Sequence, residues 1–308
     1  MQRYSIPSIA CLVSLIVSAG APADEPVAAD QSQFIALNPQ QTVLIDRAKR
    51  RVILKTQLVL RSGVLEMLCC LEGTKEHESI LSIDADAMDV HAALLQIGAE
   101  PGHPVTFVPE YTPPQGEEII IRLNWKDEED NWHRHRAQEC IRYGIHRYFE
   151  YPLDPLPVGL EIDNSEDLRY DEYSKVLVWF GPMAEEQRDE LLARHEDAEY
   201  RKGILAIFDC GQSRAMDAKW VFAGSGFRKD EQTGEELYKA ERGDLICVAN
   251  FSSATIDVAA PSSASGELLF EPWTERLPAE GTEVIVELIP VSNGQAATNH
   301  SDATDARR

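Results

Sequence analysis

Apolar residues follow a strand-like pattern over most of the chain. Short runs rich in apolar and β-branched residues alternate with polar turns, as in residues 42–46, the turn at 47–50, and residues 52–60. Runs joined by such tight turns favour antiparallel pairing. Further candidate strands are residues 65–71, 118–125, a run near His133, 176–180, 219–225, 244–250, 268–270 and 283–288. The pattern therefore predicts a mostly antiparallel sheet, with an exposed hairpin turn at 126–131.

One segment near the middle of this pattern changes to a helical period. Apolar residues recur three and four positions apart over 88–97, Asp84 or Asp86 precedes them, and Gly98 follows. An acidic cap and a terminal glycine are typical helix boundaries. Apolar residues cover much of the circumference, which predicts a buried helix. The expected fold class is α+β, a mostly antiparallel sheet with one buried helix and a helix-containing insertion.

The insertion is predicted at about residues 145–212. It begins with a proline-rich loop, contains one apolar strand at 176–180, and continues as helix, with Pro182 at the first helical position. A second helical stretch has one apolar face, made by Tyr200, Ile204, Ile207 and Phe208. We expect one domain over 41–290 that this segment interrupts. Residues 24–40 are predicted to be a linker, and the polar residues 291–308 a disordered tail.

The first residues indicate export. Residues 1–23 combine a basic start at Arg3, a short apolar run and the small-residue pattern Ala21-Pro22-Ala23, as in a secretory signal peptide. The apolar run is shorter than the roughly 20 residues that span a bilayer, and no later run is longer. We therefore expect a secreted or periplasmic protein without a transmembrane segment.

Charge and cysteine content exclude several classes of function. The formal net charge is −23, and removal of residues 1–23, whose only charged side chain is Arg3, makes it −24. Such an acidic surface repels nucleic acid. Five cysteines follow residue 23, namely Cys69, Cys70, Cys140, Cys210 and Cys247, and no CxxC motif occurs. The sequence therefore gives no support for a zinc ribbon, a thioredoxin-like motif or an iron–sulfur cluster run.

The stretch GTKEHESIL at 73–81 gathers a lysine, a histidine, two glutamates and a serine. If it forms a strand, Lys75, His77 and Ser79 lie on one face and the two glutamates on the other. Adjacent histidine and glutamate side chains then cannot share a metal ion unless a bulge or a turn intervenes. We predict a structural strand start after a turn at Gly73, with local ion pairs and with His77 as its one functional group.

An enzymatic alternative uses the same stretch. Cys70 or Ser79 would act as nucleophile, His77 as base and a glutamate as orienting group, or His77 would join His91 on a metal. The sequence contains no GxSxG elbow, no GxGxxG unit and no P-loop, so hydrolase and nucleotide-binding signatures are absent. Only one other histidine pair, His133 and His135, lies on one strand face, where we expect a solvated edge.

Four segments in order resemble one known family. They are CLEGTKEHESIL at 70–81, VHAALLQIGAEPG at 90–102, WVFAGS at 220–225, and GDLICVANFSSATIDV at 243–258. Together they resemble the YdjY-domain family of exported bacterial proteins, over about residues 40–144 and 213–290. The resemblance implies an exported domain without an assigned biochemistry. Some relatives carry the domain beside a ferredoxin module, but this sequence lacks the cysteines of such a module.

The polar residues at strand ends point to a binding or accessory module rather than an enzyme. The candidate ligand-binding residues form two groups, Lys75, Glu76, His77 and Glu78 in the first, and Ser225, Asp244 and Asn250 in the second. Their partner would be a protein or a small molecule of unknown identity. We expect no metal and no cofactor, and keep a metal- or thiol-dependent enzyme centred on His77 and Cys70 as the alternative.

Overall fold

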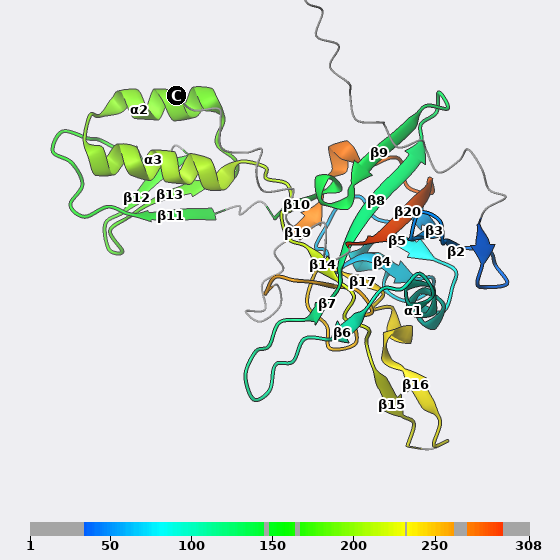
Figure 1. The fold of residues 1–308 in the computed structure, drawn as a ribbon. Coiled ribbons are helices and arrows are strands. Elements are labelled where there is room, and N and C mark those ends of the chain that lie inside the picture. Colours follow the sequence, from blue (N-terminus) through cyan, green and yellow to red (C-terminus); the bar gives the residue numbers. More distant parts are fainter. Residues whose placement is uncertain (1–33, 145–147, 164–166, 232, 262–269, 292–308) are drawn as a thin grey trace, which may run out of the picture. The chain divides into compact units, whose positions relative to one another are not determined.

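A large sheet forms the centre of the computed structural model, which describes residues 34–144, 148–163, 167–231, 233–261 and 270–291. The predicted signal peptide and most of the predicted tail lie outside these residues. The strand order is β17-β4-β5-β3-β20-β8-β14-β18, with β2 also on β3, β1 on β2, and β9 on β8 (Figure 1). The strands are β1 (Ile35–Ala36), β2 (Val43–Asp46), β3 (Arg51–Leu58), β4 (Met67–Leu71), β5 (Ser79–Ile83), β8 (Glu118–Lys126), β9 (Trp132–Arg136), β14 (Trp220–Val221), β17 (Ile246–Cys247), β18 (Asp257–Val258) and β20 (Glu283–Pro290).

The pairing in this sheet is antiparallel except between β4 and β5. The mixed α and β structure with mostly antiparallel pairing confirms the predicted class at that level. β1 lies inside the segment predicted to be a linker. Smaller two-stranded sheets pair β6 (Pro101–His103) with β7 (Gln115–Gly116), β10 (Ile141–Tyr143) with β19 (Phe270–Pro272), and β15 (Phe227–Lys229) with β16 (Glu236–Tyr238). Short 3₁₀ helices are η3 (Glu76–Glu78), η4 (Ala137–Cys140), η5 (Lys239–Arg242) and η6 (Thr274–Arg276).

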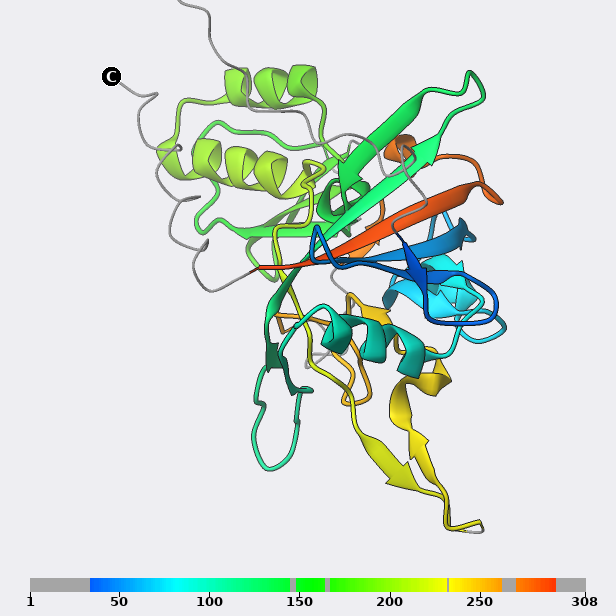
Figure 2. The same ribbon diagram turned by 45° about the vertical axis from the view of Figure 1, so that its right-hand side comes forward.

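Helix α1 (Ala87–Gln96) lies against β2 and β3 on one face of the main sheet (Figure 1 and Figure 2). It buries Ala87, Val90, Ala93 and Leu94, whereas Leu95 is 46% exposed. The prediction of a buried helix is therefore not confirmed, because only one face is covered. Asp86 takes the cap position without a side-chain cap bond, and the Glu241 carboxylate instead accepts the Ala87 and Met88 N–H groups, both at 3.0 Å.

The segment that we predicted as an insertion holds its own small sheet and two helices. Strands β11 (Tyr148–Pro152), β13 (Val176–Phe180) and β12 (Leu168–Asp171) pair in that order, beside α2 (Glu185–Arg194) and α3 (Ala198–Gly211) (Figure 1). The sequence analysis predicted β13 but not β11 or β12. Pro182 does not begin α2, because Ala184 is extended and takes the cap position, where its N–H donates to the Gln187 side chain at 2.9 Å.

The two larger apolar clusters of the described residues follow this division, and a third, small cluster contains Met67, Cys70, Cys247 and Ala254. The largest draws its buried residues from both sides of this segment, from Val43 to Ile141 and from Met216 to Leu288. The second contains only residues between Phe149 and Phe208. The two chain segments on either side of residues 149–208 thus build one common core. In the described part of the chain, no helix is long and apolar enough to cross a membrane.

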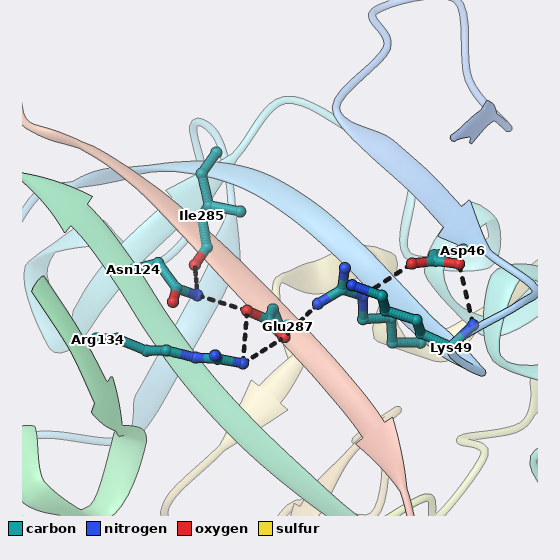
Figure 3. A network of polar contacts seen from close by, with 7 residues as sticks. Asp46, Lys49, Asn124, Arg134, Ile285 and Glu287 are labelled. Carbon is teal, nitrogen blue, oxygen red and sulfur yellow. Dashed lines mark hydrogen bonds and ion pairs between the residues drawn. The ribbon is translucent and has the colours of Figure 1, made fainter. Parts of the chain in front are cut away.

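A buried acid ties the central strands together. Glu287 on β20 is fully buried, and its carboxylate lies 2.9 Å from Arg51 Nη1 and 3.3 Å from Arg134 Nη2 (Figure 3). Asn124 donates to the same carboxylate at 3.1 Å. Arg51 Nε also pairs with Asp46 at 3.1 Å. Because these residues come from β2, β3, β8, β9 and β20, the network fixes five strands relative to one another.

Candidate functional site

The stretch 73–81 forms a tight turn before its strand begins. Gly73 has a φ of +76°, and its N–H donates to the Glu76 carboxylate. Residues Glu76–Glu78 form η3, and β5 starts only at Ser79. The predicted strand start is therefore wrong for residues 75–78. The glutamate side chain closes the turn, which a two-residue period does not reveal, and the alternation of faces does not apply there.

The turn places Lys75 at the centre of a cluster of acids. Its Nζ lies 3.1 Å from Asp244 Oδ1 and 3.4 Å from both Glu66 Oε2 and Glu78 Oε1. The ring of Phe251 lies below it, 4.2 Å from Nζ to the ring centroid. We call these five residues the Lys75 cluster.

The electrostatics of the Lys75 cluster keep the lysine charged. Burial acts to lower the pKa of Lys75, but the hydrogen bond and charge of Asp244 and the charges of Glu66 and Glu78 raise it overall. Burial and the adjacent Glu78 raise the pKa of Glu66. The Lys75 side chain is 21% exposed. A charged, partly solvated ammonium suits recognition of a polar group better than nucleophilic catalysis, which needs the neutral amine.

A serine chain links the Lys75 cluster to the second predicted group. Ser253 donates its hydroxyl hydrogen bond to Asp244, and Ser225 donates to the Ser253 carbonyl at 2.6 Å. The Asp244 side chain is almost fully buried. Lys75, Glu78 and Asp244 thus meet directly, and Ser225 reaches them through one intervening residue.

Asn250 takes part in a second, deeper group. Its amide donates to Asp257 Oδ1 at 3.3 Å and to the Val258 carbonyl at 2.8 Å, and its Oδ1 accepts from the Tyr111 hydroxyl at 3.1 Å. Asp257 is fully buried, and its Oδ2 has no hydrogen-bond partner among the described residues. Burial chiefly, with a smaller effect of the Asp244 charge, raises the pKa of Asp257 to about 8. Asp257 is therefore mostly a neutral acid at pH 7, close to the ionised cluster.

The residues of the enzymatic alternative are not arranged for nucleophilic catalysis. His77 is 76% exposed at its side chain, and its Nε2 lies 3.8 Å from the Glu78 carboxylate. Cys70 is fully buried, and burial raises the pKa of its thiol, which disfavours the reactive thiolate. Ser79 is also buried and donates to the Leu81 carbonyl at 2.7 Å. An exposed imidazole and two enclosed nucleophiles do not make a nucleophile–base pair.

The two histidines of the metal-binding alternative, His77 and His91, are also engaged differently in the structure. His91 Nδ1 lies 2.8 Å from the Tyr238 hydroxyl, and burial lowers the pKa of the imidazole. Within the described ranges, no three histidine, cysteine or acidic side chains are grouped to hold a metal ion. Glu76 and His77 remain outside the Lys75 cluster, since one closes the turn and the other faces solvent.

Sequence reasoning missed the residues that complete the two groups, which are Glu66, Tyr111, Phe251, Ser253 and Asp257. Asp257 lies in SSATIDV, where a polar residue between apolar ones is typical of the solvent face of a strand. Its burial arises because β18 and the segment after Asp244 lie side by side, with Thr255 N–H donating to the Asp244 carbonyl at 3.0 Å. Only the fold supplies that contact.

Comparison with known proteins identifies a family for the two chain segments that carry the Lys75 cluster. The family model of the YdjY domain matches residues 43–150 and 201–288, which is more than half of the chain. No curated protein matches the chain, and no solved structure matches it. The matched ranges contain every residue of the Lys75 cluster and omit most of the segment between β11 and α3. The chain belongs to the YdjY domain family.

Proposed function

We propose that this chain is an exported, non-enzymatic binding module that recognises a polar small molecule or a protein segment through the Lys75 cluster. The observation that carries this proposal is the 3.1 Å contact between Lys75 and Asp244, which joins two polar groups far apart in the sequence. Export rests on the signal-peptide pattern of residues 1–23.

The Lys75 cluster has the properties of a binding site on a rigid support. Its charged groups are only partly exposed, so a ligand would meet charges that are weakly screened by solvent. The supporting residues lie at the ends of β4, β5 and β17, where strands fix the positions of loops. The enclosed Cys70 and Ser79 favour binding over nucleophilic catalysis at this position.

A ligand screen by thermal shift tests the proposal. The chain without residues 1–23 would be heated with a set of amines, amino acids, carboxylates and sugars, each at up to millimolar concentration. A compound at about 100 times its Kd stabilises the folded state by about 2.7 kcal/mol. We expect at least one compound to raise the Tm of the wild type and to lose that effect in Lys75→Met.

The matched control is Lys229→Met, since Lys229 is exposed on the β15–β16 hairpin outside the Lys75 cluster. This variant should keep the shift. A shift that persists in Lys75→Met, or the absence of any shift in the wild type, contradicts the proposal. Elemental analysis separates it from the enzymatic alternative, because a stoichiometric transition metal that disappears in His77→Ala would favour a metalloenzyme.

A further inference from the structure

His133 and His135 lie on the face of an edge strand that continues the buried face of β8. β9 pairs with β8 along one side (Figure 1). The register sets His133 opposite Trp125 and His135 opposite Leu123. Directly opposite residues point to the same face of a sheet. Trp125 and Leu123 are buried, so both imidazoles lie on the inner face, with side chains 40% and 34% exposed. Both side chains stay partly solvated at this edge strand, and residues 275–278 line the same cleft.

The two imidazoles are held near one another by stacking on the same indole. His133 and His135 lie 5.7 Å and 5.1 Å from Trp125 between ring centroids, at interplanar angles of 10° and 18°. Their own centroids are 6.4 Å apart, at 9°. With metal–nitrogen bonds of about 2.1 Å and a ring radius of about 1.2 Å, two imidazoles have centroids about 5.4 Å apart at a tetrahedral ion, and up to about 6.6 Å apart when they bind opposite sides of one ion. The observed separation fits the second arrangement, which square-planar or octahedral coordination allows.

Each imidazole is also oriented by a carboxylate. His133 Nε2 lies 2.8 Å from Asp127 Oδ2, and His135 Nδ1 lies 3.3 Å from Glu139 Oε2. A carboxylate holds the ring nitrogen that carries the proton, and therefore leaves the lone pair on the other nitrogen. His133 Nδ1 and His135 Nε2 are then the nitrogens available to a ligand. Histidines that bind a metal commonly donate their other ring N–H to a carboxylate in this way, which fixes the orientation of the ring.

A cleft of about 410 Å³ opens over the pair. It is lined by Trp125, His133, His135, Glu139, Glu275, Arg276, Leu277 and Pro278. The volume admits an ion with several waters, each of which occupies about 30 Å³. Arg276 is the cationic residue of this lining, and it donates to the Glu139 carbonyl at 3.1 Å. With Asp127 beside the cleft, carboxylates exceed permanent cations there, which favours a bound cation.

We propose that His133 and His135 form a binding site for a divalent first-row transition metal ion, such as Ni²⁺, Cu²⁺ or Zn²⁺. Imidazole nitrogen suits these ions, whereas Mg²⁺ and Ca²⁺ prefer oxygen. Since no third side chain of the described residues converges on the same point, water completes the coordination and the ion exchanges. The site is separate from the Lys75 cluster, so this inference does not depend on the proposed binding function.

Calorimetric titration of the mature chain, without a histidine tag, with NiCl₂ and with ZnCl₂ tests the site. We expect one ion per chain with a Kd in the micromolar range, and at least a tenfold weaker Kd in His133→Gln and in His135→Gln. His103→Gln and His77→Gln are the controls, since His103 bonds a neighbouring carbonyl and His77 faces solvent. Both should bind as the wild type does.

Asp127→Asn tests whether Asp127 orients His133 for ion binding or only stabilises the turn. The amide can keep the turn contacts to the Glu129 and Asn131 N–H groups. Its NH₂ group, placed toward His133, would draw the imidazole proton to Nδ1 and block that ligand. We expect a Kd several-fold weaker at an unchanged Tm. NMR shifts of the His133 and His135 ring nitrogens on ZnCl₂ addition give an independent readout. Equal affinity of the wild type and the double variant H133Q/H135Q, or no shift at either ring, overturns the proposal.

Discussion

Asp257 is a carboxyl group whose folded environment opposes its charge. Its pKa is about 8 in the fold, because of burial and the nearby Asp244, against about 3.9 in an unfolded chain. Between these values the folded state holds a proton that the unfolded state has released. The free energy of unfolding therefore falls as the pH rises from about 4 to about 8, and this contribution is constant outside that window.

Asp257→Asn should remove this part of the pH dependence. Between pH 5 and pH 8 the wild type should lose up to about 4 kcal/mol more than the variant, at 1.36 kcal/mol per pKa unit. Urea unfolding of both proteins at pH 5, 6, 7 and 8 measures the difference. Parallel curves for the two proteins would show that Asp257 titrates in its ordinary range.

Glu287 differs from Asp257, because its buried carboxylate neutralises the positive charges of two neighbouring arginines. Arg51 and Arg134 both approach its carboxylate inside the sheet (Figure 3). Glu287→Ala would leave two guanidinium groups near an empty position, which lowers the free energy of unfolding by about 3 to 5 kcal/mol. Glu283→Ala, on the same strand but exposed, should change it by less than about 0.5 kcal/mol. Denaturant titration of both variants checks the contrast, and equal losses would contradict it.

At the scale of elements, helix α1 depends on a residue from a distant part of the chain. Glu241, on η5, accepts the first two N–H groups of the helix. We expect Glu241→Ala to reduce the free energy of unfolding by about 1 kcal/mol, the usual effect of losing a cap. Glu241→Gln retains one acceptor and should lose less, and Asp86→Ala should lose least because its side chain makes no cap bond. A larger loss in Asp86→Ala than in Glu241→Ala would reverse this assignment.

The same helix shows how far sequence reasoning reaches. Its period and Gly98 placed it within one residue, since these are local signals; the helix ends at Gln96 and Gly98 has a φ of +76°. Its cap came from Glu241, which no local pattern connects to it. Similarly, 244–250 reads as one strand, but only Ile246–Cys247 forms β17, and its register against β4 shifts between these two residues.

For the candidate site as well, local sequence signals identified some residues, and contacts between distant segments determined the rest. Lys75, Glu78 and Asp244 were identifiable as polar residues at strand ends, which is a property of the sequence. The contact of Asp244 with the Lys75 ammonium group depends on β17 lying beside β4, a pairing between segments far apart in the chain. His77 drew attention by its residue type, yet the turn that Glu76 closes leaves it facing solvent. Residue type therefore indicated the segment that contains the candidate site, and only the structure shows that Lys75 lies at its centre.

At the scale of the whole molecule, the two larger apolar clusters imply two units of local stability. The common core joins strands such as β3 and β20, whereas the cluster of the inserted segment is made only by residues from Phe149 to Phe208. Local opening follows such cooperative units, and a core substitution acts mainly within its own unit. Because the strands of the common core come from distant parts of the chain and pack on one another, we expect their backbone amide hydrogens to exchange in one cooperative opening.

Hydrogen exchange measured by mass spectrometry should resolve these units. Ile204→Ala removes buried methyl groups from α3 and should lower local stability by about 2 to 5 kcal/mol, speeding exchange in β13, α2 and α3. Exchange in β3 and β20 should stay within error of the wild type. Val286→Ala, in the common core, is the reciprocal variant and should speed exchange in β3, β8 and β20 while α3 keeps its protection. Acceleration of both groups of peptides by Ile204→Ala would mean that the two clusters unfold as one, because a single cooperative unit transmits the loss of any core contact to all of its members.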